Sequence, residues 1–499
     1  MPDALRKLRL ELAQIADLGV AARALEWDQL VMMPEAGAST RPDTLATLQR
    51  LGHELFVRDE IGELLESLEP GVADLDPESD DACLVAVTRR DWDKARRIPS
   101  ELTAEMTKLA SEGMDAWATA RANDDFASFQ PLLDRTLELK HRYVDCFPDT
   151  GDRYDPLLDD FEPGMRTDEV RSVFDTLRPA LQELVRAAPD DGPEPFLTGP
   201  YDRDVQHELS VAVARAYGAS ERYFRLDPTV HPFCMSLSTR DVRLTTRYAV
   251  DDLHGNSLFS TMHEVGHGLY EHGGDEALDR TPLATGCSSA LHESQSRLWE
   301  NVIGRSLPFW RWFYPRFRDG FANVLADVSL EQFHRAINRA QPSLIRVDAD
   351  ETTYGLHIIL RFELEQELLS GSLATSDLPE AWNAKFEELL GIRPPNDQLG
   401  CLQDVHWSGG MFGYFPTYQL GNVLSVQIWE RLLADLPDAY EQVEQGSFGE
   451  IYEWLRERLY RHGRKFTPRE TIERVAGGPI DPEPYLRYLA EKNASLAPA

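Results

Sequence analysis

Lysine is scarce in this chain: seven lysines stand among 51 basic residues, so arginine carries almost all of the positive charge. Aspartate and glutamate together number 85, which gives a formal net charge of −34 at pH 7. Such a surface repels a phosphate backbone, and we exclude nucleic acid as a partner. An acidic, lysine-poor surface also suits a salt-rich cytoplasm, because salt screens the repulsion between like charges. We therefore hypothesise a halophilic source; the alternative is the ordinary acidity of a soluble protein.

Long apolar runs are missing as well. No stretch of apolar residues approaches the ~18 residues that a membrane-spanning helix requires. The five cysteines are scattered and odd in number, which favours free thiols in a reducing compartment over a disulfide framework. The first residues lead into an amphipathic pattern with acidic side chains, unlike a signal peptide. We therefore expect a cytoplasmic protein with no membrane association.

A His-Glu-x-x-His motif stands near the middle of the chain and contains His263, Glu264 and His267. Residues four apart share one face of an α-helix, so the two histidines can direct two ring nitrogens at a single point. Neutral histidine nitrogens are good zinc ligands, and a catalytic zinc site uses three protein ligands and a water molecule. Glu264 is then the expected base that takes a proton from that water.

The residues around this motif favour a helix. Asn256 and Ser257 are residue types that cap helices, and an apolar series follows them at helical spacing. Gly266 and Gly268 oppose the helix, each by about 1 kcal/mol relative to alanine. A close approach to the helix backbone would explain both glycines, and the wall of a metal cleft is one candidate for it. The alternative to the whole interpretation is a chance motif on a core helix.

A third ligand is expected on a second helix further along the chain, which Ser288 or Ser289 can cap. A glutamate there completes a zinc site of two histidines and one carboxylate, and we choose Glu293. His292 is a rival ligand, but it would point to a different face of the same turn. Taken alone, Glu293 is a solvated helix residue; its place after the zinc motif makes it the candidate.

Six sequence blocks follow one another in a distinctive order, which is more specific than any one block. They are His231-Pro232-Phe233, Asp241-Val242-Arg243-Leu244-Thr245, the His263–His267 motif, His292-Glu293-Ser294-Gln295, Ile345-Arg346-Val347-Asp348-Ala349-Asp350 and Gly400-Cys401-Leu402-Gln403-Asp404-Val405-His406-Trp407. On these blocks the chain resembles the carboxypeptidase Taq (M32) family of metallocarboxypeptidases over nearly its whole length. The resemblance implies removal of single amino acids from peptides with a free C-terminus, with broad specificity and poor removal of proline.

The resemblance also implies a mainly α-helical clamshell with a deep central groove, built as a single catalytic domain over residues 1–499. We expect an N-terminal helical part, about residues 1–150, to close over a zinc-bearing part, about residues 151–499. One Zn²⁺ per chain is implied, which Co²⁺ or another divalent ion can replace. A homodimer is implied as well.

A change of period marks residues 230–250. Val242 and Leu244 alternate with Arg243 and Thr245, which predicts a small antiparallel sheet that lines the groove. An edge strand beside a zinc cleft can hold an extended peptide through backbone hydrogen bonds, with Arg243 and His231 as substrate contacts. The alternative is an ordinary hairpin, with Arg243 in a structural ion pair and His231 in a structural turn.

A carboxypeptidase must also bind a free carboxylate, and arginine does so through two parallel hydrogen bonds. The resemblance makes Arg346 the candidate for this role. Its structural alternative is an ion pair with Asp348 or Asp350.

His406 in the last block and the tyrosines just after it are expected to donate to the negative charge that develops on the scissile carbonyl oxygen. The separation of His406 and Tyr418 is similar to that of a histidine and tyrosine pair in related helical oligopeptidases. Tyr418 is therefore our first choice and Tyr414 the reserve. The alternative for each tyrosine is a core aromatic residue beside a glycine-rich turn.

The predicted mechanism joins these residues. Zinc held by His263, His267 and Glu293 lowers the pKa of its water, and Glu264 takes the proton and later passes it to the leaving amine. Two other functions stay open. One is an endo-acting or dipeptide-removing helical metallopeptidase, and the other is a non-catalytic zinc-containing protein that binds peptides.

Overall fold

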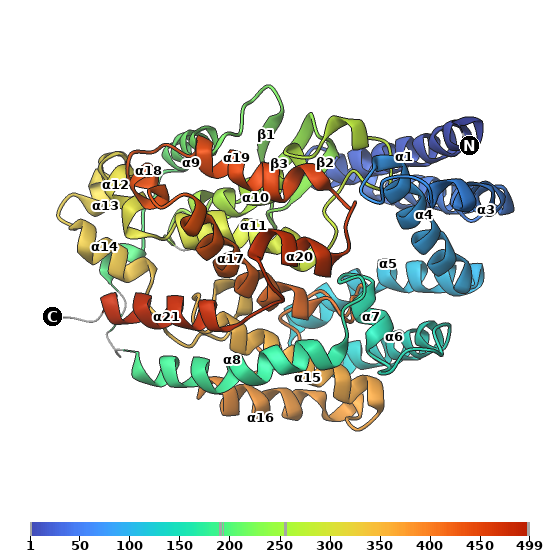
Figure 1. Ribbon diagram of the computed structural model, residues 1–499. Helices are drawn as coiled ribbons and strands as arrows, with labels where there is room; N and C mark the ends of the chain where they lie inside the picture. The colour runs from blue at the N-terminus through green and yellow to red at the C-terminus, as the bar shows by residue number, and fades with distance from the viewer. Residues whose placement is uncertain (1, 189–191, 193, 254–256, 497–499) are drawn as a thin grey trace.

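The computed structural model describes residues 2–188, 192, 194–253 and 257–496, and almost all of its regular structure is helical (Figure 1). The mainly α fold class predicted from the sequence is confirmed. None of the described helices combines the length and the apolarity that crossing a membrane requires.

The N-terminal helices are divided between two hydrophobic cores. They are α1 (Pro2–Val31), α2 (Arg41–Phe56), α3 (Asp59–Val72), α4 (Asp80–Arg97), α5 (Ser100–Asn123) and α6 (Phe126–Val144). Apolar residues of α1, α3 and α4 make up the separate core, whereas α5 and α6 contribute to the main core of the molecule. Two residues from far along the chain, Leu278 and Leu283, also lie in the N-terminal core.

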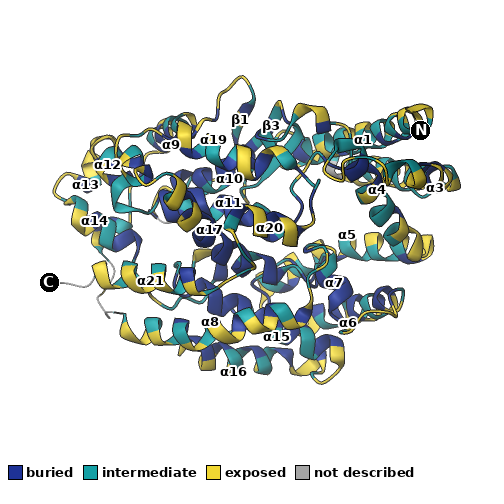
Figure 2. Ribbon diagram, in the orientation of Figure 1, coloured by how far each residue is buried: buried dark blue, intermediate teal, exposed yellow. Residues whose placement is uncertain are grey.

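The remaining helices surround the main core. They are α7 (Asp155–Asp159), α8 (Thr167–Ala187), α9 (Arg203–Tyr217), α10 (Ser257–His272), α11 (Ser289–Arg297), α12 (Leu307–Gly320), α13 (Ala322–Leu325), α14 (Leu330–Ile337), α15 (Tyr354–Ser370), α16 (Leu378–Leu390), α17 (Phe415–Asp435), α18 (Ala439–Glu444), α19 (Gly449–Arg458), α20 (Pro468–Ala476) and α21 (Glu483–Leu496). Figure 2 shows the contrast between outer helices such as α8, with one exposed face, and α17, most of whose residues are buried. The amphipathic pattern of the outer helices follows from this one-sided burial.

Among the described residues, three strands form the sheet: β1 (Phe224–Pro228), β2 (Cys234–Ser238) and β3 (Asp241–Thr246), in the order β1-β3-β2. The β2–β3 pair is antiparallel, as predicted for residues 230–250. The β1–β3 pair is parallel and β1 begins earlier, so the sheet is mixed rather than antiparallel throughout. The short segment between β1 and β2 passes the end of β3, where Thr229 N donates to Thr246 O and Thr245 N to Phe233 O. This crossover brings β1 alongside β3 in the same direction.

The close packing of helix α10 against its neighbours explains both of its glycines. A Cβ atom on Gly266 would lie 2.5 Å from the carbonyl oxygen of Gln295 in α11. A Cβ atom on Gly268 would lie 2.9 Å from side-chain atoms of Leu244 and Phe224 in the sheet. The close approach expected from the sequence is therefore real, but α11 and the sheet make it, not the wall of a cleft. Of the two expected caps, Ser257 begins the helix and Asn256 lies outside the described residues.

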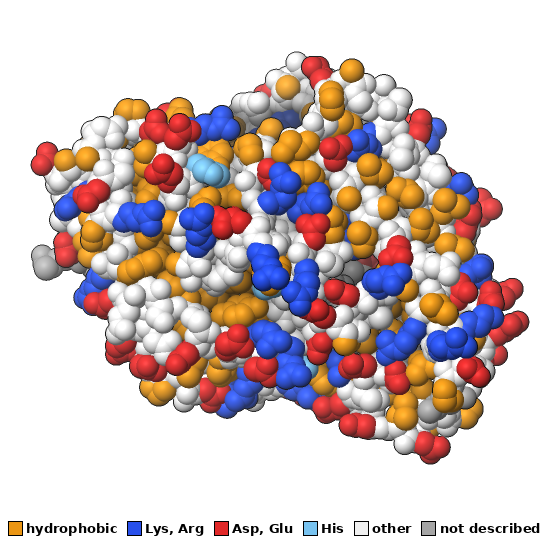
Figure 3. Space-filling model, turned by 90° about the horizontal axis from the view of Figure 1, so that it is seen from above, with side chains coloured by type: hydrophobic (Ala, Val, Ile, Leu, Met, Phe, Trp, Pro, Cys, Tyr) orange, Lys and Arg blue, Asp and Glu red, His pale blue; other side chains and the backbone are white. Residues whose placement is uncertain are grey.

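Ion pairs link the N-terminal helices to the C-terminal part of the chain. Arg464 lies 2.9 Å from Asp91, Lys465 lies 2.7 Å from Asp80 and Arg474 lies 2.6 Å from Glu78. The three basic residues of these bridges, and Glu78, border a cavity of about 940 Å³, which none of the predicted site residues lines. Acidic and basic side chains also alternate over the face seen from above (Figure 3). The acidic excess is therefore not gathered into one uniform patch on that face.

Candidate metal centre and active site

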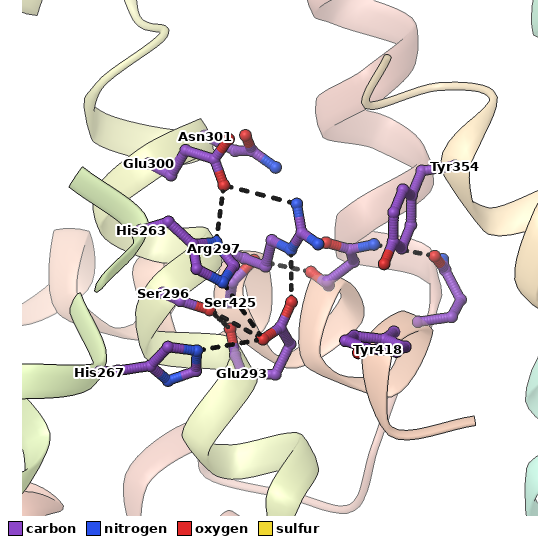
Figure 4. Close-up of polar contacts among 12 residues, drawn as sticks. His263, His267, Glu293, Ser296, Arg297, Glu300, Asn301, Tyr354, Tyr418 and Ser425 are labelled. Atoms are coloured by element: carbon purple, nitrogen blue, oxygen red, sulfur yellow. Dashed lines mark hydrogen bonds and ion pairs between the residues drawn. The ribbon is translucent and has the colours of Figure 1, made fainter. Parts of the chain in front are cut away.

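Helices α10 and α11 bring the three predicted metal ligands together (Figure 4). The Nε2 atoms of His263 and His267 lie 3.7 and 3.4 Å from Oε2 of Glu293. All three donor atoms lie within 4.8 Å of one another. Two imidazole nitrogens and one carboxylate oxygen in this arrangement are a donor set typical of a divalent metal in a catalytic site.

The helices hold these side chains rigidly. Ser288 caps α11, with its hydroxyl accepting from the backbone N–H of Leu291 at 3.1 Å. Glu293 itself is 5% exposed. The helix α17 packs against it so closely that a Cβ atom on Gly421 would lie 2.7 Å from the Glu293 side chain. A glycine at that place in α17 lets the third donor sit between two helices.

The charges around the site favour a cation. Burial alone would lower the pKa of His263, but the carboxylates of Glu293, Glu300 and Glu264 more than offset this and raise it. Burial lowers the pKa of His267 to about 4, so its ring is neutral and can offer a lone pair. Although burial disfavours its charge, the pKa of Glu293 is held well below the ordinary range by Arg297 and both histidines. The residues present therefore fit a divalent metal ion.

Glu300 and Arg297 contact the donor set. The sequence interpretation did not identify either residue. Oε2 of Glu300 lies 2.9 Å from Nδ1 of His263, and Arg297 donates from Nε to Glu293 at 2.7 Å. Glu300 lies in the π-helical turn η4 (Leu298–Ile303) that continues α11. Such turns are frequent at functional sites. The spacing of Glu293, Arg297 and Glu300 along one helix face was the available signal.

Glu264 is on the same turn of α10 as His263 and is 5% exposed. Burial raises its pKa to about 7, with further raising by Glu293 and Glu300 and lowering by His263. A carboxyl group with this pKa can accept and return a proton near neutral pH.

His406, Tyr414 and Tyr418 form an aromatic cluster at the start of α17. Nε2 of His406 lies 3.1 Å from the hydroxyl oxygen of Tyr418, and the ring of His406 stacks on that of Tyr414 at 5.6 Å between centroids. Burial lowers the pKa of His406 to about 3, so this ring is neutral. Burial raises the pKa of both tyrosines, and the negative charge of Glu293 contributes to the increase in both.

Arg346 is buried and its partner is Asp404, not Asp348 or Asp350. Its Nε and Nη2 atoms donate to one oxygen of Asp404 at 3.0 and 2.8 Å, and Nη1 donates to the hydroxyl of Tyr354 at 2.9 Å. The guanidinium carbon lies 4.9 Å from the ring centroid of Tyr418. The arginine is therefore held rigidly beside the aromatic cluster.

The remaining two candidates lie at the sheet. Arg243 pairs with Asp241 at 3.1 Å and lies over the indole of Trp27, with Arg225 on that ring as well, both 4.6 Å from the centroid. These contacts tie α1 to the sheet. His231 is exposed by surface area, yet its ring is partly covered, and this partial burial, together with the charges of Arg247 and Arg121, lowers its pKa.

Comparisons with known proteins agree with one another. A family model described as carboxypeptidase Taq (M32) metallopeptidase matches residues 7–493. Thermostable carboxypeptidase 1 of Thermus thermophilus is 41% identical, over 99% of this chain and 98% of that protein. Carboxypeptidase 1 of Bacillus subtilis is 36% identical over 97% of each chain. The crystal structure of an M32 carboxypeptidase from Deinococcus radiodurans superposes with a TM-score of 0.94, at 41% identity and 99% coverage of both chains.

Proposed function

Since the chain belongs to the carboxypeptidase Taq (M32) family of metallopeptidases, we propose that it is a zinc carboxypeptidase that removes one amino acid at a time from peptide C-termini. The named relatives are carboxypeptidases, so the chain is a peptide hydrolase. The observation that carries the metal assignment is the convergence of His263, His267 and Glu293.

These three residues would hold one zinc ion, and Co²⁺ can replace it. When bound there, the ion would supply Lewis-acid chemistry, which acidifies water and polarises a carbonyl oxygen. Glu264 accepts the proton of the attacking water and returns it to the leaving amine, a role that its pKa of about 7 supports.

Tyr418 is the proposed donor to the carbonyl oxygen as negative charge develops there. With its proton on Nε2, the neutral ring of His406 donates to the Tyr418 oxygen. The hydroxyl proton of Tyr418 is then directed to the substrate, where a preorganised donor lowers the barrier. Tyr414, in contact with both rings, is the second candidate.

Arg346 is the proposed clamp for the terminal carboxylate of the substrate. The hydrogen bonds to Asp404 and Tyr354 use some of its five N–H groups and fix the plane of the guanidinium. Only one residue separates the scissile carbonyl from the terminal carboxylate, so their two binding groups must be neighbours. The 4.9 Å between the Arg346 guanidinium and the Tyr418 ring supports this arrangement. His231 and Arg243 complete the proposed substrate-binding set, although the ion pair and stacking of Arg243 also fit a structural role.

We further propose a single catalytic domain over residues 1–499, arranged as a clamshell with a central groove. Its N-terminal part, about residues 1–150, closes over the zinc-bearing part, about residues 151–499. The separate core of α1, α3 and α4 supports a body that moves as a unit.

A homodimer is supported by α2, all of whose residues are described and none of which is buried, and by the exposed side chains of Leu30, Met32 and Leu51. The five free cysteines support a cytoplasmic location. We also propose that the enzyme accepts a broad range of C-terminal residues and removes proline poorly.

A blocked dipeptide tests this function directly. An N-terminally blocked dipeptide with a free carboxylate should release its last amino acid in a reaction that a chelator stops and zinc restores. The same dipeptide with a C-terminal amide is the matched control and should be cleaved far more slowly. Equal cleavage of the two, or cleavage only at internal bonds of longer peptides, would favour an endopeptidase and exclude the clamp. Binding without cleavage would favour a non-catalytic peptide-binding protein.

A further inference from the structure

A second histidine lies behind the metal-binding side of His267. The Nδ1 atom of His267 is 2.6 Å from Nδ1 of His292. On its other side, Nε2 of His292 is 2.8 Å from Oε1 of Glu271. The three side chains form a line that ends at the ring nitrogen facing Glu293.

The direction of the hydrogen bonds along this line follows from what each group can donate. The carboxylate of Glu271 accepts, so Nε2 of His292 is the nitrogen that donates to it. For His267 to bind a metal through Nε2, its proton must be on Nδ1, and Nδ1 of His292 is then the acceptor in the 2.6 Å contact. The lone pair of His267 is left on Nε2, the atom that lies 3.4 Å from Glu293.

We propose that Glu271 and His292 form a relay that fixes the tautomer and the ring orientation of His267 for metal binding. This inference rests on the proposed metal site and assigns two positioning residues to it. His263 meets a carboxylate directly, through Glu300, whereas His267 meets one through an intervening histidine. His292, the rival ligand from the sequence, thereby has a defined place next to the donor set rather than within it.

Helix geometry and packing hold the relay in place. Glu271 follows His267 by four residues on α10, so both lie on one helix face and His292 of α11 bridges them. The ring of Tyr270 stacks on that of His292, with 5.1 Å between centroids and 29° between planes. A Cβ atom on Gly286 would lie 3.1 Å from Cδ2 of His292. The imidazole therefore has little room to turn away from His267.

Metal affinity tests the relay without reference to turnover. Zn²⁺ binding to the full chain is measured by competition with a chromogenic chelator, and the Co²⁺ form is followed by its visible absorption. His292→Leu should weaken Zn²⁺ binding by about 10- to 100-fold and alter the Co²⁺ spectrum. His292→Asn places an oxygen acceptor where Nδ1 was and should recover most of the affinity. His272→Leu is the control, because His272 lies on α10 and contacts the carbonyl of Thr239 instead.

A double mutant distinguishes a relay from two independent packing effects. Glu271→Leu should weaken Zn²⁺ binding in the native chain and have no further effect in the His292→Leu background, because Glu271 acts only through His292. Native affinity in His292→Leu, or an equal loss from Glu271→Leu in both backgrounds, would overturn the proposal. Thermal melting in chelator checks folding, and His292→Asn and Glu271→Leu still decide the matter if His292→Leu does not fold.

Two ligand variants separate this inference from the proposed function. If His267→Ala and Glu293→Ala retain native Zn²⁺ affinity, the metal site itself is wrong. If both lose the ion while the His292 and Glu271 variants keep it, only the relay is wrong.

Discussion

The carboxylate of Glu300 lies 2.9 Å from Nδ1 of His263, the ring nitrogen that faces away from Glu293. Burial alone would raise the pKa of Glu300, but His263, Arg297 and Arg305 lower it to about 2. The ionised carboxylate therefore accepts the Nδ1 proton of His263, so Nε2 is the nitrogen that can bind a metal.

Removal of Glu300 should weaken the metal site. We expect Glu300→Ala to lower Zn²⁺ affinity by about 10- to 100-fold, because the tautomer of His263 is no longer fixed. Glu300→Gln keeps an acceptor oxygen and should lose less. Isothermal titration with Zn²⁺ measures both, and equal affinities for the two variants would show that the carboxylate does not orient the ring.

Glu264→Gln should leave metal binding intact and reduce catalysis. Its carboxyl is the proposed proton acceptor, so kcat should fall by about 100- to 10,000-fold. The Zn²⁺ content of the variant, determined by atomic absorption, should equal that of the native chain. Substantial activity in a zinc-loaded variant would contradict the role of base.

Arg346→Ala should remove the preference for a free C-terminus. We expect kcat/KM for a blocked dipeptide acid to fall by about 100-fold or more, with little change for the matched amide. Arg346→Lys keeps the charge but lacks the paired donors and should not restore activity. Because Arg346 also holds Asp404, the acid-to-amide ratio is the measurement, rather than activity alone.

Tyr418→Phe should lower kcat more than it changes KM. Loss of one donor to the developing oxyanion costs about 100- to 1,000-fold in rate. Tyr414→Phe is the matched variant in the same cluster and should cost less. Steady-state kinetics on one substrate separate the two, and a larger loss from Tyr414→Phe would exchange their roles.

Glu365 should make the folded state less stable as the pH rises. It accepts hydrogen bonds from Trp407 at 2.8 Å and from the backbone N–H of Gly413 at 3.0 Å, on either side of the loop that follows His406. Burial, despite these bonds, raises its pKa to about 7 from 4.5. The folded state thus binds the proton more tightly than the unfolded state, so stability is lost between about pH 4.5 and 7, by roughly 3 kcal/mol.

Glu365→Gln tests this linkage. The amide does not titrate, so the difference in unfolding free energy between pH 5 and pH 8 should be smaller in the variant. Urea denaturation of both chains in chelator measures it, and parallel pH profiles would refute the buried charge as the cause.

The helices that bear the predicted metal ligands were predicted from the spacing of residues along the chain. The four-residue spacing of His263 and His267 placed both on one face of α10, and the capped segment around Glu293 formed α11 as expected. These two features depend on neighbours in the sequence, which a helical period reveals. The mainly helical fold, which the family resemblance implied, was also predicted correctly.

The features that the sequence did not predict depend on long-range contacts. Asp404 is the partner of Arg346 because two distant loops meet, whereas the sequence suggested only the nearby aspartates. Strand β1 was missed because it is short, contains Asp227 and Pro228, and gains its ladder only from β3. Glu271 and His292 lie on different helices, so no pattern along either helix reveals their contact.

Leu278 and Leu283 belong to the connection between α10 and α11, yet they are packed in the core of the N-terminal helices. The two helices that carry the predicted metal ligands are thus connected to the N-terminal core. The movement of the N-terminal part proposed above would pull on this connection and so on both helices. The opening that admits a peptide would then also displace the proposed metal ligands.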